Sequence, residues 1–308
     1  ASEDEKPILT FRISDDAFKG AKKYYLKNLN WIDAFPQPER CFGSLCENVR
    51  RLLGMEEAGE LPKPAQQKQP ESSLEPTDPE EQCNLGRRYE TGDGVPKDAK
   101  KAFYWYQKAA EQGYALGQYK LGSCYDNGLG VSLDFQQAVY WYRKAAEQGY
   151  AGGQRNLGFG YECGVGVSKD FQQAFYWYHK AAEQDNALAQ NNLGLCYAEG
   201  NGVFKDSQQA VYWYRKAAEQ GYTAAQLNLG YCYRVGKGVS KDSQQAVYWY
   251  RKAADQGSVF GQYQLGYYYQ YGEGVSKDLK QAVYWYRKAA QQGYTTAKCA
   301  LMNLGETW

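Results

Sequence analysis

A unit of 36 residues recurs along most of this chain, and this repeat constrains the fold more than any other feature. A Leu-Gly pair and a pair of glycines return at this step six times without insertion or deletion. A seventh copy begins after Gly293 and contains only the first part of the unit. The tryptophans of the repeat are Trp105, Trp141, Trp177, Trp213, Trp249 and Trp285. Self-similarity at a fixed period of this length is the signature of a repeat array.

Each unit is predicted to form two helices. The first contains Q-x-x-L-G-x-x-Y, with small or apolar residues at helical spacing, and ends at two glycines that can adopt a positive φ. The second begins at an aspartate such as Asp134, which can cap the free N–H groups of the first turn. It ends at a glycine, except in the third unit, where Asp185 stands. One such helix pair cannot bury its own apolar face, so we expect stacked units to share a continuous core.

The pattern A-x-x-Q-x-x-L-G-x-x-Y-x-x-G-x-G-V-x-x-D-x-x-x-A-x-x-W-Y-x-K-A-A-x-Q-G closely resembles the Sel1-like repeat, a relative of the tetratricopeptide repeat. The resemblance extends from Asp78 to Leu304. It implies an all-α fold, a right-handed α/α superhelical solenoid of Sel1-like helix pairs with a short non-repeat N-terminal segment. It also implies an adaptor or scaffold that binds another protein or peptide, because many family members have that role.

The chain changes in composition before the repeats. Residues 1–55 are predicted to be a non-repeat N-terminal segment, residues 56–77 a flexible linker rich in Glu, Gln and Pro, and residues 78–308 the solenoid of six full units plus a terminal helix. Three roles remain open for residues 1–55: a cap on the first repeat, a partner-binding segment, or an element that occupies the solenoid's own groove.

The first helix of each unit lines the concave face in this superfamily. Positions on that helix that differ between units cannot be required for stacking, and several of them share one face by the i, i+4, i+8 rule. The alternative is that these side chains are solvated or tie adjacent helices, and that the tyrosines belong to the core. The predicted partner-binding residues are Tyr119, Arg155, Phe159, Asn192, Leu227, Asn228, Tyr231, Arg234, Phe260, Tyr263, Tyr267 and Tyr271.

No residues in the sequence form a recognisable catalytic, metal-binding or cofactor-binding motif. The one histidine, His179, is expected at the exposed surface, without the partners of a catalytic triad. Cys41 and Cys46 form C-x4-C without a second pair, a weak sign of zinc. We therefore expect a protein that is not an enzyme and has no cofactor or metal.

The formal net charge of +1 gives no reason to expect a nucleic acid as partner. No apolar run approaches the roughly 18 residues of a membrane-spanning helix. The cysteines differ from those of Sel1-like proteins whose units are each stapled by a disulfide, since Ala146 and Ala218 stand at one of the expected positions. Partly buried, reduced thiols favour a reducing compartment such as the cytoplasm, including that of a host cell for a secreted effector.

Three functional hypotheses follow. The first is an adaptor that holds a partner peptide or protein in the concave groove. The second is a regulator or secreted effector whose specific activity lies in the N-terminal segment. The third is a structural protein that assembles into homo-oligomers through its incomplete seventh unit.

Overall fold

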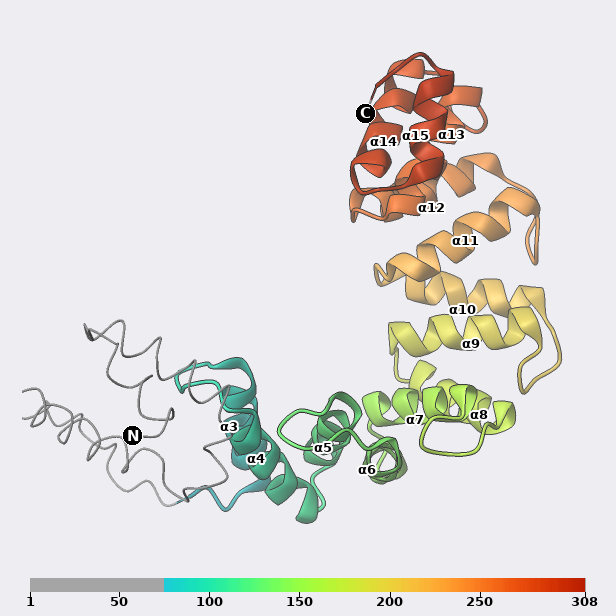
Figure 1. Cartoon of the computed structure of the whole chain (residues 1–308). Helices are drawn as coiled ribbons and strands as arrows, with labels where there is room; N and C mark the ends of the chain where they lie inside the picture. The colour runs from blue at the N-terminus through green and yellow to red at the C-terminus, as the bar shows by residue number, and fades with distance from the viewer. Residues whose placement is uncertain (1–74, 308) are drawn as a thin grey trace, which may run out of the picture. The chain divides into compact units, whose positions relative to one another are not determined.

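The computed structural model describes residues 75–307, which contain thirteen helices, labelled as in Figure 1, and no strands. The first helices of the units are α3 Pro79–Thr91, α5 Ala115–Asn127, α7 Ala151–Cys163, α9 Ala187–Glu199, α11 Thr223–Val235 and α13 Val259–Tyr271. The second helices are α4 Ala99–Glu111, α6 Phe135–Glu147, α8 Phe171–Ala182, α10 Ser207–Glu219, α12 Ser243–Asp255 and α14 Leu279–Gln291, and α15 Thr295–Asn303 follows. The prediction of an all-α solenoid of helix pairs is thus confirmed. Residues 1–55 and most of the predicted linker lie outside the described range.

An aspartate caps the start of every even-numbered helix, as the sequence predicts. Asp134 Oδ1 accepts hydrogen bonds from the backbone N–H groups of Gln136 and Gln137, both at 3.0 Å. The amide of Asp134 in turn donates to the carbonyl of Tyr125 at 3.0 Å, which ties the turn to the preceding helix. These bonds satisfy N–H groups that a helix start otherwise leaves free.

The turns after the helices use left-handed backbone where the sequence places glycine. Each odd-numbered helix from α3 to α13 ends at a glycine with positive φ, such as Gly164 at 71°. Asp185 takes the place of the glycine that follows the other even-numbered helices and has a φ of 58°. Aspartate tolerates this conformation better than most residues with a Cβ atom, which explains why the third unit keeps its register.

A glycine and a tyrosine form the centre of each unit. Leu157 and Tyr178 are fully buried, and the tyrosine ring lies directly over Gly158. A Cβ atom at Gly158 would lie 2.8 Å from Tyr178 Cδ1, closer than packed carbon atoms allow. The tyrosine ring thus leaves no room for a side chain at the glycine of the Leu-Gly pair, which explains why this glycine and the tyrosine recur together.

Tryptophan and a second glycine join neighbouring units. Trp213 of α10 lies in the same buried cluster as Ala181 and Ala182 of the preceding unit. A Cβ atom at Gly166 would lie only 2.1 Å from the carbonyl oxygen of Phe135, at the start of the previous unit's second helix. The backbones of adjacent units thus approach each other closely at the turn, and only glycine allows this contact.

A buried glutamine connects three helices at each boundary between units. Gln154 of α7 is 4% exposed, and its Oε1 accepts a hydrogen bond from Gln184 Nε2 at 2.8 Å. Its own Nε2 donates to the carbonyl of Ala146 in the preceding unit at 3.2 Å. The equivalent residues are Gln82, Gln118, Gln190, Gln226 and Gln262. Buried amides persist when both ends are satisfied, as they are here.

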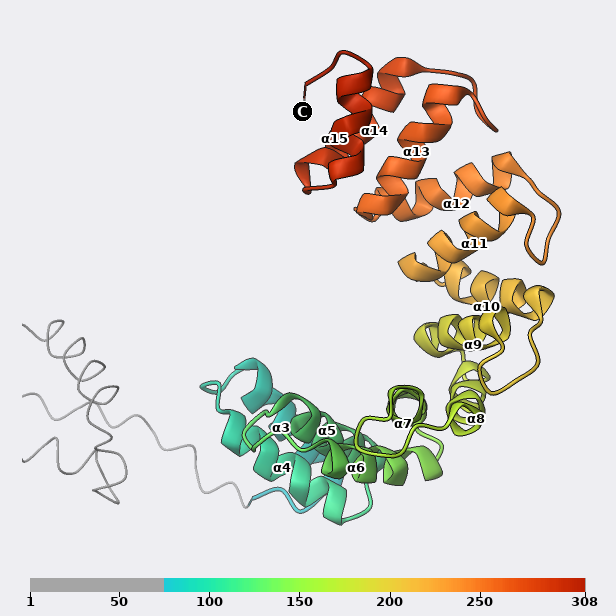
Figure 2. The same cartoon turned by 45° about the vertical axis from the view of Figure 1, so that its right-hand side comes forward.

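Within the described residues the helices follow one another along a curved array (Figure 1). In both views α3 and α5 lie on the inner side of the bend, and α4 and α6 lie on its outer side (Figure 2). None of the helices from α3 to α15 is long and apolar enough to cross a membrane.

Candidate functional site

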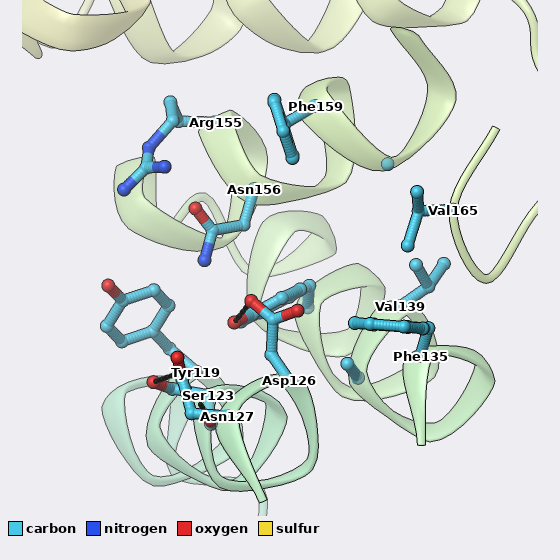
Figure 3. Close-up of a pocket in the computed structure, with 13 residues that line it drawn as sticks. Tyr119, Ser123, Asp126, Asn127, Phe135, Val139, Arg155, Asn156, Phe159 and Val165 are labelled. Carbon is cyan, nitrogen blue, oxygen red and sulfur yellow. Dashed lines mark hydrogen bonds between the residues drawn. The ribbon is translucent and has the colours of Figure 1, made fainter. Parts of the chain in front are cut away.

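The groove between successive odd-numbered helices contains a cavity of about 270 Å³ at its α5–α7 step. Helix α6, which follows α5 in the chain and precedes α7, forms the floor of this cavity. The site is therefore built from three helices (Figure 3). One side is aromatic and aliphatic, and the other is polar. The lining residues include Tyr119, Ser123, Asp126, Asn127, Phe135, Val139, Tyr142, Arg155, Asn156, Phe159 and Val165.

A second cavity of about 180 Å³ lies two units further along, between α9 and α11. Its lining residues occupy the same positions of the repeat, 72 residues later in the sequence. Tyr231 replaces Phe159, Asn228 replaces Asn156, and Tyr214 replaces Tyr142. The groove therefore repeats one kind of cavity along its length and varies the side chains that line it.

The polar side of the first cavity holds opposite charges that do not neutralise each other. Asp126 accepts a hydrogen bond from the Tyr142 hydroxyl at 3.1 Å. Burial and the nearby Asp126 carboxylate raise the pKa of Tyr142 far above its usual range, so the hydroxyl keeps its proton. Arg155 forms no salt bridge within residues 75–307, and Asn156 lies between it and Asp126 in Figure 3. The cavity thus offers separate donors and acceptors to a ligand.

None of the twelve predicted binding residues is fully buried. Phe159, Tyr231, Phe260 and Tyr271 are exposed, and the other eight are half-buried. Several of the tyrosines pack on one another: the ring centroids of Tyr267 and Tyr271 are 4.6 Å apart, and Tyr263 lies against Tyr286 and Tyr294. The tyrosines at the C-terminal end of the groove are therefore partly accessible to a ligand and also pack against neighbouring rings.

The structure brings only some of the predicted residues into the two cavities. Tyr119, Arg155 and Phe159 line the first cavity, and Asn228 and Tyr231 line the second. The guanidinium of Arg234 lies 5.2 Å from the ring centroid of Tyr231. Neither cavity includes the other seven predicted residues, which are Asn192, Leu227, Arg234, Phe260, Tyr263, Tyr267 and Tyr271.

Sequence reasoning missed the contribution of the even-numbered helices. Phe135, Val139 and Tyr142 of α6 line the first cavity, whereas the predicted binding residues all lie on the first helices of the units. Asp126 was also left out, although it lies at a position that differs between units. The missing information was the three-dimensional pairing of Asp126 with Tyr142, sixteen residues later.

His179 lies at the surface, as the sequence predicts, although neighbouring aromatic rings cover part of its side chain. Its side chain is 37% exposed and packs between Phe175 and Trp213, each with a ring-centroid distance of 5.9 Å. Nδ1 lies 3.5 Å from a carboxylate oxygen of Glu183, one helical turn away. The aromatic residues at the boundary between units cover the imidazole because they extend across it to fill the gap between helices.

The six cysteines of the described range are free. Cys163 and Cys299 are exposed, and the other four are buried. Burial raises the pKa of the Cys124 thiol from 9.0 to about 12, so this thiol stays protonated. Residues 75–307 contain no cluster of His, Cys, Asp and Glu that could hold a metal ion, and Cys41 and Cys46 lie outside this range.

Comparison with known proteins agrees with this architecture. The family model described as the Sel1 repeat matches residues 82–114, 115–150, 151–186, 187–222, 223–258 and 259–294. No match was found among curated proteins.

Among solved structures, a protective antigen present in uropathogenic Escherichia coli strains is 40% identical with a TM-score of 0.69, covering 73% of this chain and 48% of the antigen. A Sel1 repeat protein from Oxalobacter formigenes is 39% identical with a TM-score of 0.64, covering 69% of this chain and 85% of that protein. This chain thus spans about half the length of the Escherichia coli antigen.

Proposed function

Because this chain belongs to the Sel1-repeat family, we propose that it is an adaptor that holds an extended segment of a partner protein in the groove between its odd-numbered helices. Sel1-repeat proteins generally mediate protein–protein interactions. The family provides the class of function, and the groove of this chain supports the finer proposal about where the partner lies.

The recurrence of the cavity carries the proposal. The cavities at α5–α7 and α9–α11 use the same repeat positions, so a partner that lies along the groove meets them in succession. An extended peptide can place one side chain in each, because its side chains project at regular intervals. A compact ligand would contact only one of them.

The size of the cavities also favours side chains over a cofactor. Sites for drug-sized ligands and cofactors measure about 300–1,000 Å³. The two cavities here, at about 270 and 180 Å³, are smaller than that range. Their volumes are sufficient for single side chains.

The exposed aromatic residues are the expected anchors of this interaction. Phe159 is 50% exposed at the first cavity, and Tyr231 is 44% exposed at the second. Large aromatic side chains bury much area at a small entropic cost and are frequent among the residues that dominate binding energy. Asn156 and Asn228, one per cavity, can hydrogen-bond the backbone of an extended segment.

A pair of matched double variants tests the proposal. Phe159→Ala with Tyr231→Ala, the groove variant, removes the anchors. Tyr176→Ala with Tyr212→Ala, the outer-face variant, removes two rings of similar exposure on the even-numbered helices α8 and α10, and neither ring lines a cavity. Partners are first captured from a native lysate with the whole chain, and their affinity is then measured with each variant. We expect the groove variant to bind roughly tenfold more weakly or worse, and the outer-face variant to bind like the parent. Equal loss in both, or loss only in the outer-face variant, would refute a binding site in the groove.

A further inference from the structure

One position of the repeat, eight residues after the buried glutamine, provides an acceptor for a buried tyrosine. The hydroxyl of Tyr142 donates to Asp126 at 3.1 Å, and that of Tyr178 donates to Glu162 at 2.5 Å. In the sixth unit the acceptor is an amide oxygen, that of Gln270, at 2.7 Å from Tyr286. In the first unit Tyr106 donates to Glu90. We call this the acceptor position.

The fourth and fifth units break this rule, because their acceptor positions hold Ala198 and Arg234. Only the fifth unit places a charged donor there. An arginine side chain has five N–H donors and no acceptor. Arg234 therefore cannot accept the hydroxyl proton of Tyr250, the tyrosine of this unit. Tyr250 is fully buried, and its hydroxyl has no hydrogen-bond partner within residues 75–307. Arg234 Nε is also buried without a partner.

A third unpaired group lies beside these two. Tyr268 of α13 takes the place of the cysteines Cys124, Cys196 and Cys232 of other units. It is fully buried, its hydroxyl has no partner, and its ring centroid lies 5.9 Å from that of Tyr250. Burial raises the pKa of Tyr250 to about 12, so its hydroxyl remains a donor at neutral pH. Three donors without partners thus meet where the first, second, third and sixth units pair a tyrosine with an acceptor.

We propose that this cluster of Arg234, Tyr250 and Tyr268 binds a carboxylate of the partner segment. This inference rests on the proposed function, because it assumes that a peptide lies in the groove. A carboxylate has only acceptors, and its planar geometry matches the guanidinium in a bidentate pair. Arg234 is only half-buried, so the carboxylate reaches this residue first. The hydroxyls of Tyr250 and Tyr268 are fully buried, so a small side-chain movement must accompany any contact with them.

The charges around the cluster favour a carboxylate over a phosphate dianion. Arg234 is the cation of the cluster, and the two hydroxyls are neutral. The carboxylate of Glu273 is near enough to add to the effect of burial in raising the pKa of Tyr268. With Arg234 as its positive charge and Glu273 nearby, the cluster balances the single negative charge of a carboxylate better than the two charges of a phosphate dianion.

The position of the cluster links it to the second cavity. The guanidinium of Arg234 lies over the ring of Tyr231, which lines that cavity. A segment whose side chain enters the cavity would therefore have its next residues beside Arg234. The acceptor positions of the first three units hold the carboxylates of Glu90, Asp126 and Glu162. These carboxylates repel an acidic residue of the partner, whereas Arg234 of the fifth unit attracts it.

The test uses a variant that restores the arrangement of the other units. Arg234→Glu places a carboxylate next to Tyr250, as Glu162 lies next to Tyr178, so we expect it to fold. Lys252→Glu makes the same change of charge on the exposed face of α12 and serves as the control. The probe is N-acetylglycine, a carboxylate attached to one peptide group, titrated into each whole chain. NMR follows the backbone amides of α11 and α13 in all three chains, and the Nε–H resonance of Arg234 in the parent and in Lys252→Glu.

We expect saturable shifts in α11 and α13 for the parent and for Lys252→Glu, and no saturable shifts for Arg234→Glu. Absence of binding to the parent, or equal binding to Arg234→Glu, would overturn the inference. Inorganic phosphate is the second probe, and phosphate binding roughly tenfold tighter than that of N-acetylglycine would show that the assigned carboxylate class is wrong.

Selection from a displayed library of random peptides separates this inference from the function on which it rests. Parent and Lys252→Glu are expected to enrich peptides with Asp or Glu at one position, and Arg234→Glu to lose that enrichment. Enriched peptides without an acidic preference would overturn the inference and leave the groove as the binding site. Failure of the parent to select any peptide would contradict the proposed function, and the N-acetylglycine titration would then still decide whether the cluster binds a carboxylate.

Discussion

Glycine has two separate tasks in each unit. The glycine of the Leu-Gly pair is helical and leaves room for a tyrosine ring, as Gly158 does for Tyr178. From the second unit on, the second glycine of each turn, such as Gly130 with a φ of 72°, has positive φ and also contacts the preceding unit. Gly149 has a similar φ of 87° but has nothing within 4 Å of a Cβ atom. Two substitutions can therefore separate the cost of conformation from the cost of contact.

We predict that Gly149→Ala lowers the free energy of unfolding by about 1–2 kcal/mol, the cost of a left-handed alanine. Gly130→Ala should cost several kcal/mol more, because its Cβ atom would lie 2.1 Å from the carbonyl oxygen of Ala99 and the two units would have to move apart. Urea unfolding of both variants measures the difference. Equal costs would show that the units tolerate separation at this turn.

The acceptor position shows how one residue can change what a unit recognises without changing the fold. Asp126 and Arg234 lie at the same place in units that pack alike, yet one accepts from a tyrosine and the other cannot. Their roles depend on a hydroxyl from the next helix, sixteen residues away in sequence. The repeat thus separates residues that build the array from residues that vary the groove.

Helices are held in register by the buried glutamines as well as by apolar contacts. Gln190 is fully buried, donates to the carbonyl of Ala182 at 3.2 Å, and accepts from Gln220 at 2.8 Å. It thereby joins α9 to both the preceding and the following even-numbered helix. A hydrogen bond of this kind contributes modestly, but removing one partner leaves the others unsatisfied.

We predict that Gln190→Met lowers the free energy of unfolding by about 2–4 kcal/mol, because it leaves a carbonyl and an amide buried without partners. Gln208→Met on the exposed face of α10 is the control and should change stability by less than about 0.5 kcal/mol. Thermal unfolding followed by circular dichroism compares them. A cost for Gln190→Met as small as that of the control would mean that apolar packing alone fixes the register.

The helices could be predicted from the sequence because each boundary is marked by a residue with a local reason to be there. Asp134 caps its helix, and Asp185 adopts the left-handed backbone, as expected. The groove was predicted less well, because its walls depend on which side chains meet across helices. Phe135 of an even-numbered helix lines a cavity that was expected to involve the first helices alone, and His179 packs on Trp213 of the next unit. Such contacts follow from the distance between units, which no local pattern specifies.

The array as a whole buries thiols and phenols that ionise readily only when it unfolds. Burial raises the pKa of Cys124 and Cys196 from 9.0 to about 12, and that of Cys83 and Cys232 to about 11. An unfolded thiol loses its proton near pH 9, whereas the folded one keeps it. The stability that these groups contribute is therefore complete below pH 9 and is lost as the pH rises toward 12.

We predict that the free energy of unfolding falls steeply between about pH 9 and pH 12, by about 1.4 kcal/mol per pH unit for each such thiol. Cys124→Ala should make the fall shallower by this amount, and Cys163→Ala, at an exposed site, should change it much less. Denaturant titrations at a series of pH values provide the measurement. An identical pH dependence in parent and Cys124→Ala would show that the thiol ionises in the folded chain.

The account depends most on the position of the partner along the groove. Site-specific incorporation of benzoylphenylalanine at Phe159 or Tyr231, followed by irradiation in cell lysate, tests that position directly. The same photoreactive residue at Tyr176 or Tyr212 provides the comparison, because these side chains are equally exposed on the outer helices. We predict that one partner becomes cross-linked from Phe159 and Tyr231 and not from Tyr176 or Tyr212. Cross-linking of the partner from the outer positions alone, or equally from all four, would contradict binding in the groove.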